Sequence, residues 1–386
     1  MTHTGAALAI PLALSLPTLF NGVSAAQIDG PDLILLDSLV LEETGEHHIG
    51  NPLGLFVGAD GSVLVSDGFA QTVLRYDTTG RLIGRFGRGG QGPGEFMNLG
   101  GVGFVAATVA GFLDESGRLE LFGLTDGAQS GRVRMDMNNR TSSFSVREDS
   151  LWYAGINPVS SATFGAVAIP DLLNAVRADE QPAPILLNRG VAPAPYAEAH
   201  ALARSLSHAF IDVGDDDVIL GFTASPFLLR TDHAGDGVDT AWIAPGGRRG
   251  EPAEDEFIAA MRSDRATSQQ DLRSWMLDFF ESVSFVRDLS RDEHGNVYTV
   301  HQDADRDDEG SMTGVRLYLA VSRFDGEDGC ADTLIPTSDI GAPVPFLEDS
   351  TLWVLDRRLA GAATAGLATV VRRFAIDAEQ CTGRVR

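Results

Sequence analysis

The feature that most constrains the fold is a run of four short apolar segments, each separated from the next by a tight turn. The segments span residues 53–57, 62–66, 72–76 and 81–86 and are rich in Val, Leu, Ile and aromatic residues. Asp, Gly and Thr occupy the positions between them, as in the turns of β-hairpins. Four strands of about five residues joined in this way predict one antiparallel meander.

The same pattern recurs along the chain. Residues 101–137 repeat the order of strand, Asp-containing turn, strand, glycine turn and strand, and looser copies begin near residues 144, 210, 291 and 345. A repeat of roughly 40 to 65 residues built wholly of strands is typical of a β-propeller, in which each unit is one blade. The sequence therefore predicts an all-β fold, a six-bladed β-propeller of four-stranded antiparallel blades.

A glycine-rich segment, GRFGRGGQGPGEF at residues 84–96, follows the fourth strand of the first unit. It is expected to cross from the outermost strand of blade 1 to the innermost strand of blade 2, where glycine permits unusual φ values and close backbone approach. Together with GADGSVLVSDGFAQTVLRYDTTGRLIGRFG before it, this segment resembles the NHL-repeat type of six-bladed propeller. The resemblance covers residues 51–137 and implies the fold, but it transfers no functional residue.

Ring closure predicts a role for an apolar stretch that precedes blade 1. Residues 32–43, DLILLDSLVLEE, have no partner of their own, and blade 6 offers only three strands, at residues 344–347, 351–355 and 369–375. We expect residues 32–43 to pair with blade 6 as its outer strand, which leaves no open edge between the first and last blades.

One segment departs from the blade pattern. Apolar residues in the segment 251–282 follow the three-four spacing of amphipathic helices. This predicts a small helical insert between blades 4 and 5 that packs as a cap over one face of the disc. The alternative is that the cap forms one wall of a binding cleft.

The N-terminus predicts export. The first 26 residues contain no Asp, Glu, Lys or Arg and carry an apolar run at residues 6–20, followed by small residues that suit a signal peptidase. The run is shorter than the roughly 20 residues of a membrane span. Residues 1–26 are therefore expected to be a signal peptide, with no stable membrane span, and residues 27–386 one propeller domain located in the periplasm or outside the cell.

Composition excludes several chemistries. All 29 basic residues are Arg, so a lysine Schiff base and a phosphate-binding loop with its lysine are both impossible. The net charge of −25 makes nucleic acid an unsuitable partner. The sequence also lacks the GxSxG, HExxH and CxxC motifs.

The two cysteines, Cys330 and Cys381, would stand at equivalent outer positions of adjacent blades if the repeat continues to the C-terminus. Such positions are roughly 15 to 20 Å apart, given strands about 4.8 Å apart within a blade, whereas a disulfide needs Cα atoms within about 7 Å. Two separate thiols are expected. A disulfide remains the alternative if the C-terminal tail leaves the repeat.

Candidate site residues come from the loops that lead into the innermost strands, because these loops line the mouth of a central channel. Aligning the blades gives His47, His48, Asn51, Asn98, Arg140, Arg204, His208, Arg287 and Asp339. This set is more cationic than the chain as a whole, which favours an anionic ligand, since Arg presents a planar fork to carboxylate or phosphate. The alternative is that these side chains form salt bridges with neighbouring acids.

Acidic clusters could suggest metal binding, but each matches a loop or turn better. Residues 303–310 depart from the calcium loop at two key positions and are expected to form a solvated hairpin. Residues 215–217 are expected to form a turn, and Asp292 to cap another.

The predicted function is therefore an exported, monomeric binding scaffold that needs no cofactor, with an unknown small molecule or protein as partner. The main alternative is a metal-dependent hydrolase or lyase. Propellers of the gluconolactonase and streptogramin-lyase types resemble this chain in blade number, and the resemblance would imply a divalent metal such as calcium at the axis. A disc that binds a partner through its blade rims is a third possibility.

Overall fold

The computed structural model describes most of the predicted blades. The described residues are 30–45, 47–114, 117–135, 143–155, 163–178, 186–188, 208–223, 225, 227–242, 284–306, 312–324, 330, 332–338, 340–359, 367–379 and 381. The predicted signal peptide at residues 1–26 and the predicted helical insert at residues 251–282 both lie outside them.

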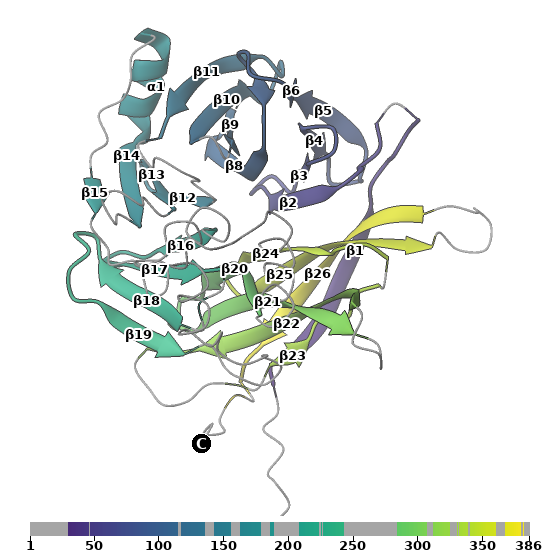
Figure 1. The fold of residues 1–386 in the computed structure, drawn as a ribbon, viewed down its shortest axis with the longest axis vertical. Coiled ribbons are helices and arrows are strands. Elements are labelled where there is room, and N and C mark those ends of the chain that lie inside the picture. Colours follow the sequence, from purple (N-terminus) through teal and green to yellow (C-terminus); the bar gives the residue numbers. More distant parts are fainter. Residues whose placement is uncertain are drawn as a thin grey trace, which may run out of the picture.

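Six four-stranded antiparallel sheets surround a common axis (Figure 1), which confirms the six-bladed β-propeller. Blade 1 consists of β2 (Pro52–Val57), β3 (Val63–Asp67), β4 (Thr72–Tyr76) and β5 (Leu82–Phe86). Blade 2 consists of β8 (Leu99–Ala106), β9 (Val109–Asp114), β10 (Arg118–Gly123) and β11 (Gln129–Arg134). Blade 3 consists of β12 (Ser143–Arg147), β13 (Ser150–Ala154), β14 (Phe164–Ala168) and β15 (Leu186–Asn188).

The second half of the ring has the same plan. Blade 4 consists of β16 (Ala209–Val213), β17 (Asp217–Phe222), β18 (Phe227–Asp232) and β19 (Asp239–Trp242). Blade 5 consists of β20 (Phe285–Arg291), β21 (Val297–Arg306), β22 (Met312–Ser322) and β23 (Thr333–Leu334). Blade 6 consists of β24 (Val344–Glu348), β25 (Thr351–Leu359), β26 (Leu367–Asp377) and β1 (Asp32–Val40).

The first strands of the blades, β2, β8, β12, β16, β20 and β24, form what we call the inner ring. Each contacts the next around the axis, and β24 contacts β2. Apolar side chains on the faces of neighbouring blades pack together; one such cluster joins Leu55, Val65 and Leu74 of blade 1 to Val344 and Leu355 of blade 6. Burial between blades therefore holds the ring together.

The ring closes as predicted. β1 pairs antiparallel with β26, from Asp32 opposite Asp377 to Val40 opposite Val370. The chain begins the first blade only after contributing the outermost strand of the last one, so the two ends of the ring are joined by backbone hydrogen bonds.

The glycine-rich segment also behaves as predicted, crossing from β5 to β8. Within it, β6 (Arg88–Gly89) and β7 (Glu95–Phe96) form a short parallel pair. Gly87 has a φ of +69°, and a Cβ there would lie 2.1 Å from Cε2 of Phe96. This position therefore requires glycine for both its conformation and its space.

A helix that the sequence analysis did not expect lies between β14 and β15. α1 (Ile169–Ala178) carries Pro170 and Asp171 in its first turn and Arg177 in its last, which suits the helix dipole. Leu172 is fully buried against blades 2 and 3. No helix among the described residues is long and apolar enough to cross a membrane.

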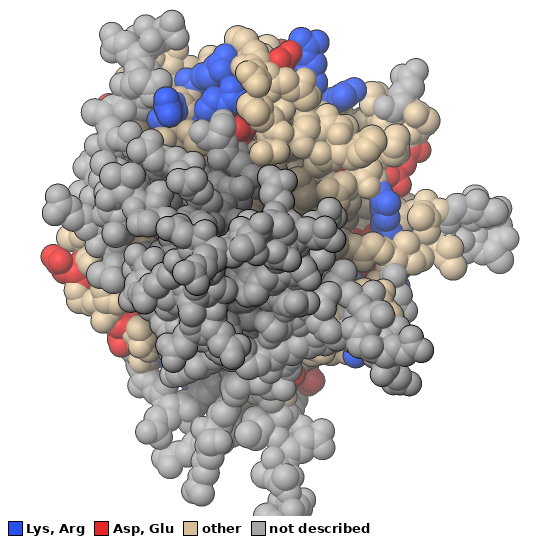
Figure 2. Space-filling model, viewed as in Figure 1, with Lys and Arg blue, Asp and Glu red and all other residues tan. Residues whose placement is uncertain are grey.

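The surface charge is unevenly distributed. Figure 2 shows Arg side chains gathered over the outer strands of blades 1 and 2, although the chain carries 25 more acidic than basic residues. Arg85 on β5 and Arg134 on β11 are exposed, and so is Arg88 on β6 between the two blades. Arg88 is paired with Glu95 at 2.7 Å.

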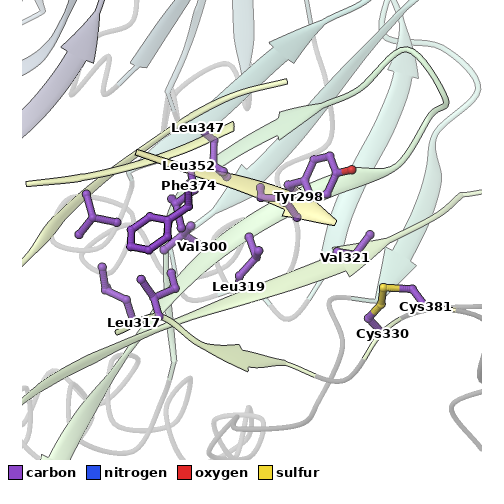
Figure 3. Packing of buried hydrophobic residues seen from close by; sticks show 13 residues of the cluster. Tyr298, Val300, Leu317, Leu319, Val321, Cys330, Leu347, Leu352, Phe374 and Cys381 are labelled. Atoms are coloured by element: carbon purple, nitrogen blue, oxygen red, sulfur yellow. A yellow bond between two sulfur atoms is a disulfide. The ribbon is translucent and has the colours of Figure 1, made fainter. Parts of the chain in front are cut away.

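The expectation of two separate thiols is wrong: Cys330 and Cys381 form a disulfide, with Cα atoms 5.0 Å apart. Because β1 supplies the fourth strand of blade 6, the chain leaves β26 at Asp377 and turns back toward blade 5, with the Cys381 N–H bonded to the Ala378 carbonyl. Both cysteines are buried in the cluster between blades 5 and 6 (Figure 3). The error came from placing Cys381 on a fourth strand that the tail does not form.

Candidate functional site

The described members of the predicted site lie before or within the first strands of their blades. His47 and His48 lie between β1 and β2, Asn51 directly precedes β2, and Asn98 and His208 directly precede β8 and β16. Arg287 lies within β20 instead of before it. Arg140, Arg204 and Asp339 are outside the described residues. Five of the nine predicted residues thus stand at the entries to innermost strands, and one lies within such a strand.

The segments that lead into the inner ring are held by acids on the second strand of several blades. The carboxylate of Asp67 accepts the Gly50 and Asn51 N–H groups at 3.0 and 2.8 Å. Asp114 accepts the Met97 N–H at 2.7 Å, and Asp356 accepts the Ser338 N–H at 3.1 Å. These acids accept hydrogen bonds from backbone N–H groups. This structural role explains why acids recur at this position in several blades, with no need to invoke a ligand.

A shallow cavity of about 140 Å³ lies at the outer part of blade 1. It brings together two of the predicted residues, His47 and His48, with Arg85 and the exposed ring of Phe69. Asp67, Ala70, Thr72 and Leu74 complete its lining. The cavity combines nitrogen donors with an apolar floor, and its lining comes from the β1–β2 connection and from blade 1.

Arg287 has the most unusual setting of the predicted residues. The register of β20 against β21 shifts between Val286 and Asp288, so Arg287 is the extra residue of a β-bulge on the inner ring. Bulges redirect side chains and often occur next to functional sites. Among the described residues, none makes a hydrogen bond or salt bridge to the Arg287 side chain. Burial lowers the pKa of Arg287, and the neighbouring Asp288 charge partly opposes this effect.

Asp288 is the companion of Arg287 on the inner ring. Its carboxylate accepts the Leu289 N–H at 2.9 Å and the Leu347 N–H of β24 at 2.7 Å. Burial raises the pKa of Asp288 to about 7, against the lowering effect of these hydrogen bonds. The group therefore changes charge near neutral pH, beside a guanidinium that has no bonded carboxylate among the described residues.

Arg291, the other arginine of β20, is fully engaged. Its Nε lies 2.7 Å from Oδ1 of Asp212 on β16, and its Nη1 bonds to Asp217. Burial raises the pKa of Asp212, although Arg291 opposes the increase. Arg291 thus joins blades 4 and 5, and its charge is already balanced.

The inner ring of blades 6, 1, 2 and 3 is aromatic. The ring centroid of Phe56 lies 5.0 Å from that of Phe346 and 5.4 Å from that of Phe104. Phe144 approaches from the other side, because Gly103 leaves room: a Cβ there would lie 3.0 Å from Phe144 and 3.4 Å from Phe56. All four rings remain partly exposed. We call Phe346, Phe56, Phe104 and Phe144 the aromatic wall.

Asp292 caps a turn and Asp215 and Asp216 lie in another, as expected. The expected solvated loop at residues 303–310 is wrong at its start, because Asp303 is buried within β21, and residues 307–310 lie outside the described residues. Asp292 accepts the N–H groups of His294 and Asn296, both at 2.9 Å, and the Tyr298 hydroxyl at 2.8 Å. Asp215 lies in the turn between β16 and β17, and residues 303–306 extend β21 toward its hairpin with β22. Within the described ranges, no three Asp, Glu, His or Cys side chains gather as a metal site.

Sequence reasoning missed Asp288 and the aromatic wall. A signal for the wall is present: the innermost strands read Leu-Phe-Val at 55–57, Gly-Phe-Val at 103–105, Ser-Phe-Ser at 143–145 and Pro-Phe-Leu at 345–347. Asp288 carried no such signal, because its setting depends on a bulge and on a contact with a different blade.

Comparison with protein families finds no match for the sequence, and comparison with functionally curated proteins finds none either. Solved structures do resemble the fold. A member of the DUF4221 family from Bacteroides vulgatus aligns with a TM-score of 0.55 at 10% identity, over 91% of this chain and 99% of the other. A predicted exported protein from Bacteroides fragilis aligns with a TM-score of 0.56 at 10% identity, over 92% of this chain and 97% of the other. At such identities the likeness supports the fold alone.

Proposed function

We propose that this protein is an exported six-bladed propeller of NHL-repeat type that binds an anionic ligand on its inner ring and acts as a binding scaffold. The turn at residues 84–96 supports the NHL type, and the apolar stretch at residues 6–20 supports export. The Cys330–Cys381 disulfide supports export as well, because such bonds persist mainly in oxidising compartments. A monomer with a small molecule or a protein as partner is the simplest form of this proposal.

One observation carries the ligand class: Arg287 is a partly buried guanidinium with no bonded carboxylate among the described residues. A charge removed from water is costly unless it is paired and hydrogen-bonded. A carboxylate or phosphate group would supply this pairing in the bidentate geometry that Arg favours. Asp288 supplies only part of it, because its carboxylate accepts the Leu289 and Leu347 N–H groups.

Arg287→Gln tests the proposal. Calorimetric titration with acetate, phosphate and sulfate should show at least one anion that binds the native protein and loses about ten- to a hundredfold in affinity in the variant, as expected for a charged hydrogen bond. Arg177→Gln is the control, since Arg177 lies on α1 and bonds only to Asn174 among the described residues. Equal anion binding by the native protein and Arg287→Gln would contradict the proposal.

Elemental analysis of the dialysed protein separates this function from the alternative. A stoichiometric divalent metal such as calcium would favour a metal-dependent hydrolase or lyase and would direct a screen of lactones and esters. The proposed binding scaffold, in contrast, needs no metal to bind its anion.

A further inference from the structure

The inner ring has a charged side and an aromatic side, and the two adjoin between blades 5 and 6. Asp288 Oδ2 on β20 accepts the Leu347 N–H of β24 at 2.7 Å. Arg287 directly precedes Asp288, and Phe346 directly precedes Leu347. A single hydrogen bond therefore connects the segment that carries the Arg287 guanidinium with the segment that begins the aromatic wall.

The aromatic wall continues from this junction around the axis. Phe346 contacts Phe56 and Phe56 contacts Phe104, while Phe144 and Phe56 both lie close to Gly103. All four rings keep part of their surface exposed on the strands closest to the axis. Ligand sites are typically lined by apolar and aromatic side chains with a few placed polar groups, which matches this combination.

From this juxtaposition we infer that the ligand is an aromatic carboxylate, whose carboxylate pairs with Arg287 while its planar ring packs on Phe346 and Phe56. The inference rests on the proposed function and adds the ligand's apolar part. Flat rings pack on Phe side chains in offset or edge-to-face geometry, which favours an aromatic over a saturated ligand of similar size. A small inorganic anion would leave the aromatic wall uncovered.

Three carboxylates that differ only in their apolar part test this inference: 2-naphthoate, cyclohexanecarboxylate and acetate. We expect 2-naphthoate to bind most tightly, and Phe56→Leu to weaken its binding about three- to tenfold, in keeping with the loss of one aromatic pair. Acetate affinity should change less than about twofold in the same variant, because acetate reaches only the guanidinium. Arg287→Gln should weaken all three.

Phe69→Leu is the matched control, since this ring is 79% exposed on blade 1 and away from the inner ring. Phe346→Leu provides a second test if Phe56→Leu lowers the melting temperature. If the three carboxylates bind through Arg287 with equal affinity, the inference is wrong and the proposed function stands. If no carboxylate binds but phosphate or sulfate binds through Arg287, the inference is wrong and the proposed function stands; if none of these anions binds, both are wrong. If 2-naphthoate binds equally well to Arg287→Gln, the inference is wrong.

Discussion

At the scale of single residues, Asp288 on the inner ring makes the free energy of unfolding depend on pH. Its pKa of about 7 in the folded protein lies above the 3.8 of a free aspartate. The folded state therefore binds one proton more than the unfolded state between these two values, so ionisation of Asp288 lowers stability as pH rises from about 4 to 7. Above pH 7 the contribution is constant.

Asp288→Asn tests this by keeping the side chain neutral at every pH. Urea unfolding at pH 5 and pH 8 should show that the native protein loses about 1–3 kcal/mol more than the variant over this interval, since one pKa unit corresponds to about 1.4 kcal/mol. Asp77→Asn is the control, because this partly exposed acid has a pKa lowered to about 2 by hydrogen bonds from Thr79 and is ionised at both pH values. Parallel pH profiles of the native protein and Asp288→Asn would show that Asp288 does not titrate in this range.

At the scale of strands, the sequence pattern was sufficient to predict the structure where a strand contacts its neighbours along the chain. The four strands of blade 1 were predicted to within a residue or two, because alternating apolar residues and Gly- or Asp-containing turns specify a hairpin directly. The helix α1 was missed because ten residues within a blade give too short a periodic signal. The bulge at Arg287 and the path of the tail to Cys381 depend on packing between blades, which no single repeat encodes.

The strand β1 carries the prediction that belongs to this scale. Deleting residues 30–44 removes the outer strand of blade 6 and opens the ring between its first and last blades, exposing the edge of β26. We expect loss of the cooperative thermal transition, followed by circular dichroism or calorimetry. The control is Leu36→Ser, since Leu36 is 49% exposed at the bulge of β1 and has no partner in the β1–β26 register. A deletion variant with an unchanged transition would show that the other strands suffice to close the ring.

At the scale of the whole molecule, blade 6 has two connections to its neighbours besides the chain that runs from β23 to β24. β1 ties it to the N-terminal side of blade 1, and the Cys330–Cys381 disulfide ties it to blade 5 across a separation of 51 residues. In the chain-entropy account, a closed loop of this length restricts the unfolded state and stabilises the fold by about 2–4 kcal/mol. The disulfide thus adds to the burial of both cysteines between the blades.

The disulfide also connects stability with cellular location. Replacing both cysteines with Ser should lower the free energy of unfolding by about 2–4 kcal/mol, and a reductant should lower it for the native protein but not for the variant. Protein recovered from the periplasm or medium should contain no free thiol and, by intact mass, should lack residues 1–26. Two titratable thiols in exported protein would contradict the pairing, whereas a retained N-terminus on an oxidised protein would contradict only the signal peptide. The two measurements therefore test the fold's covalent link and its proposed location independently.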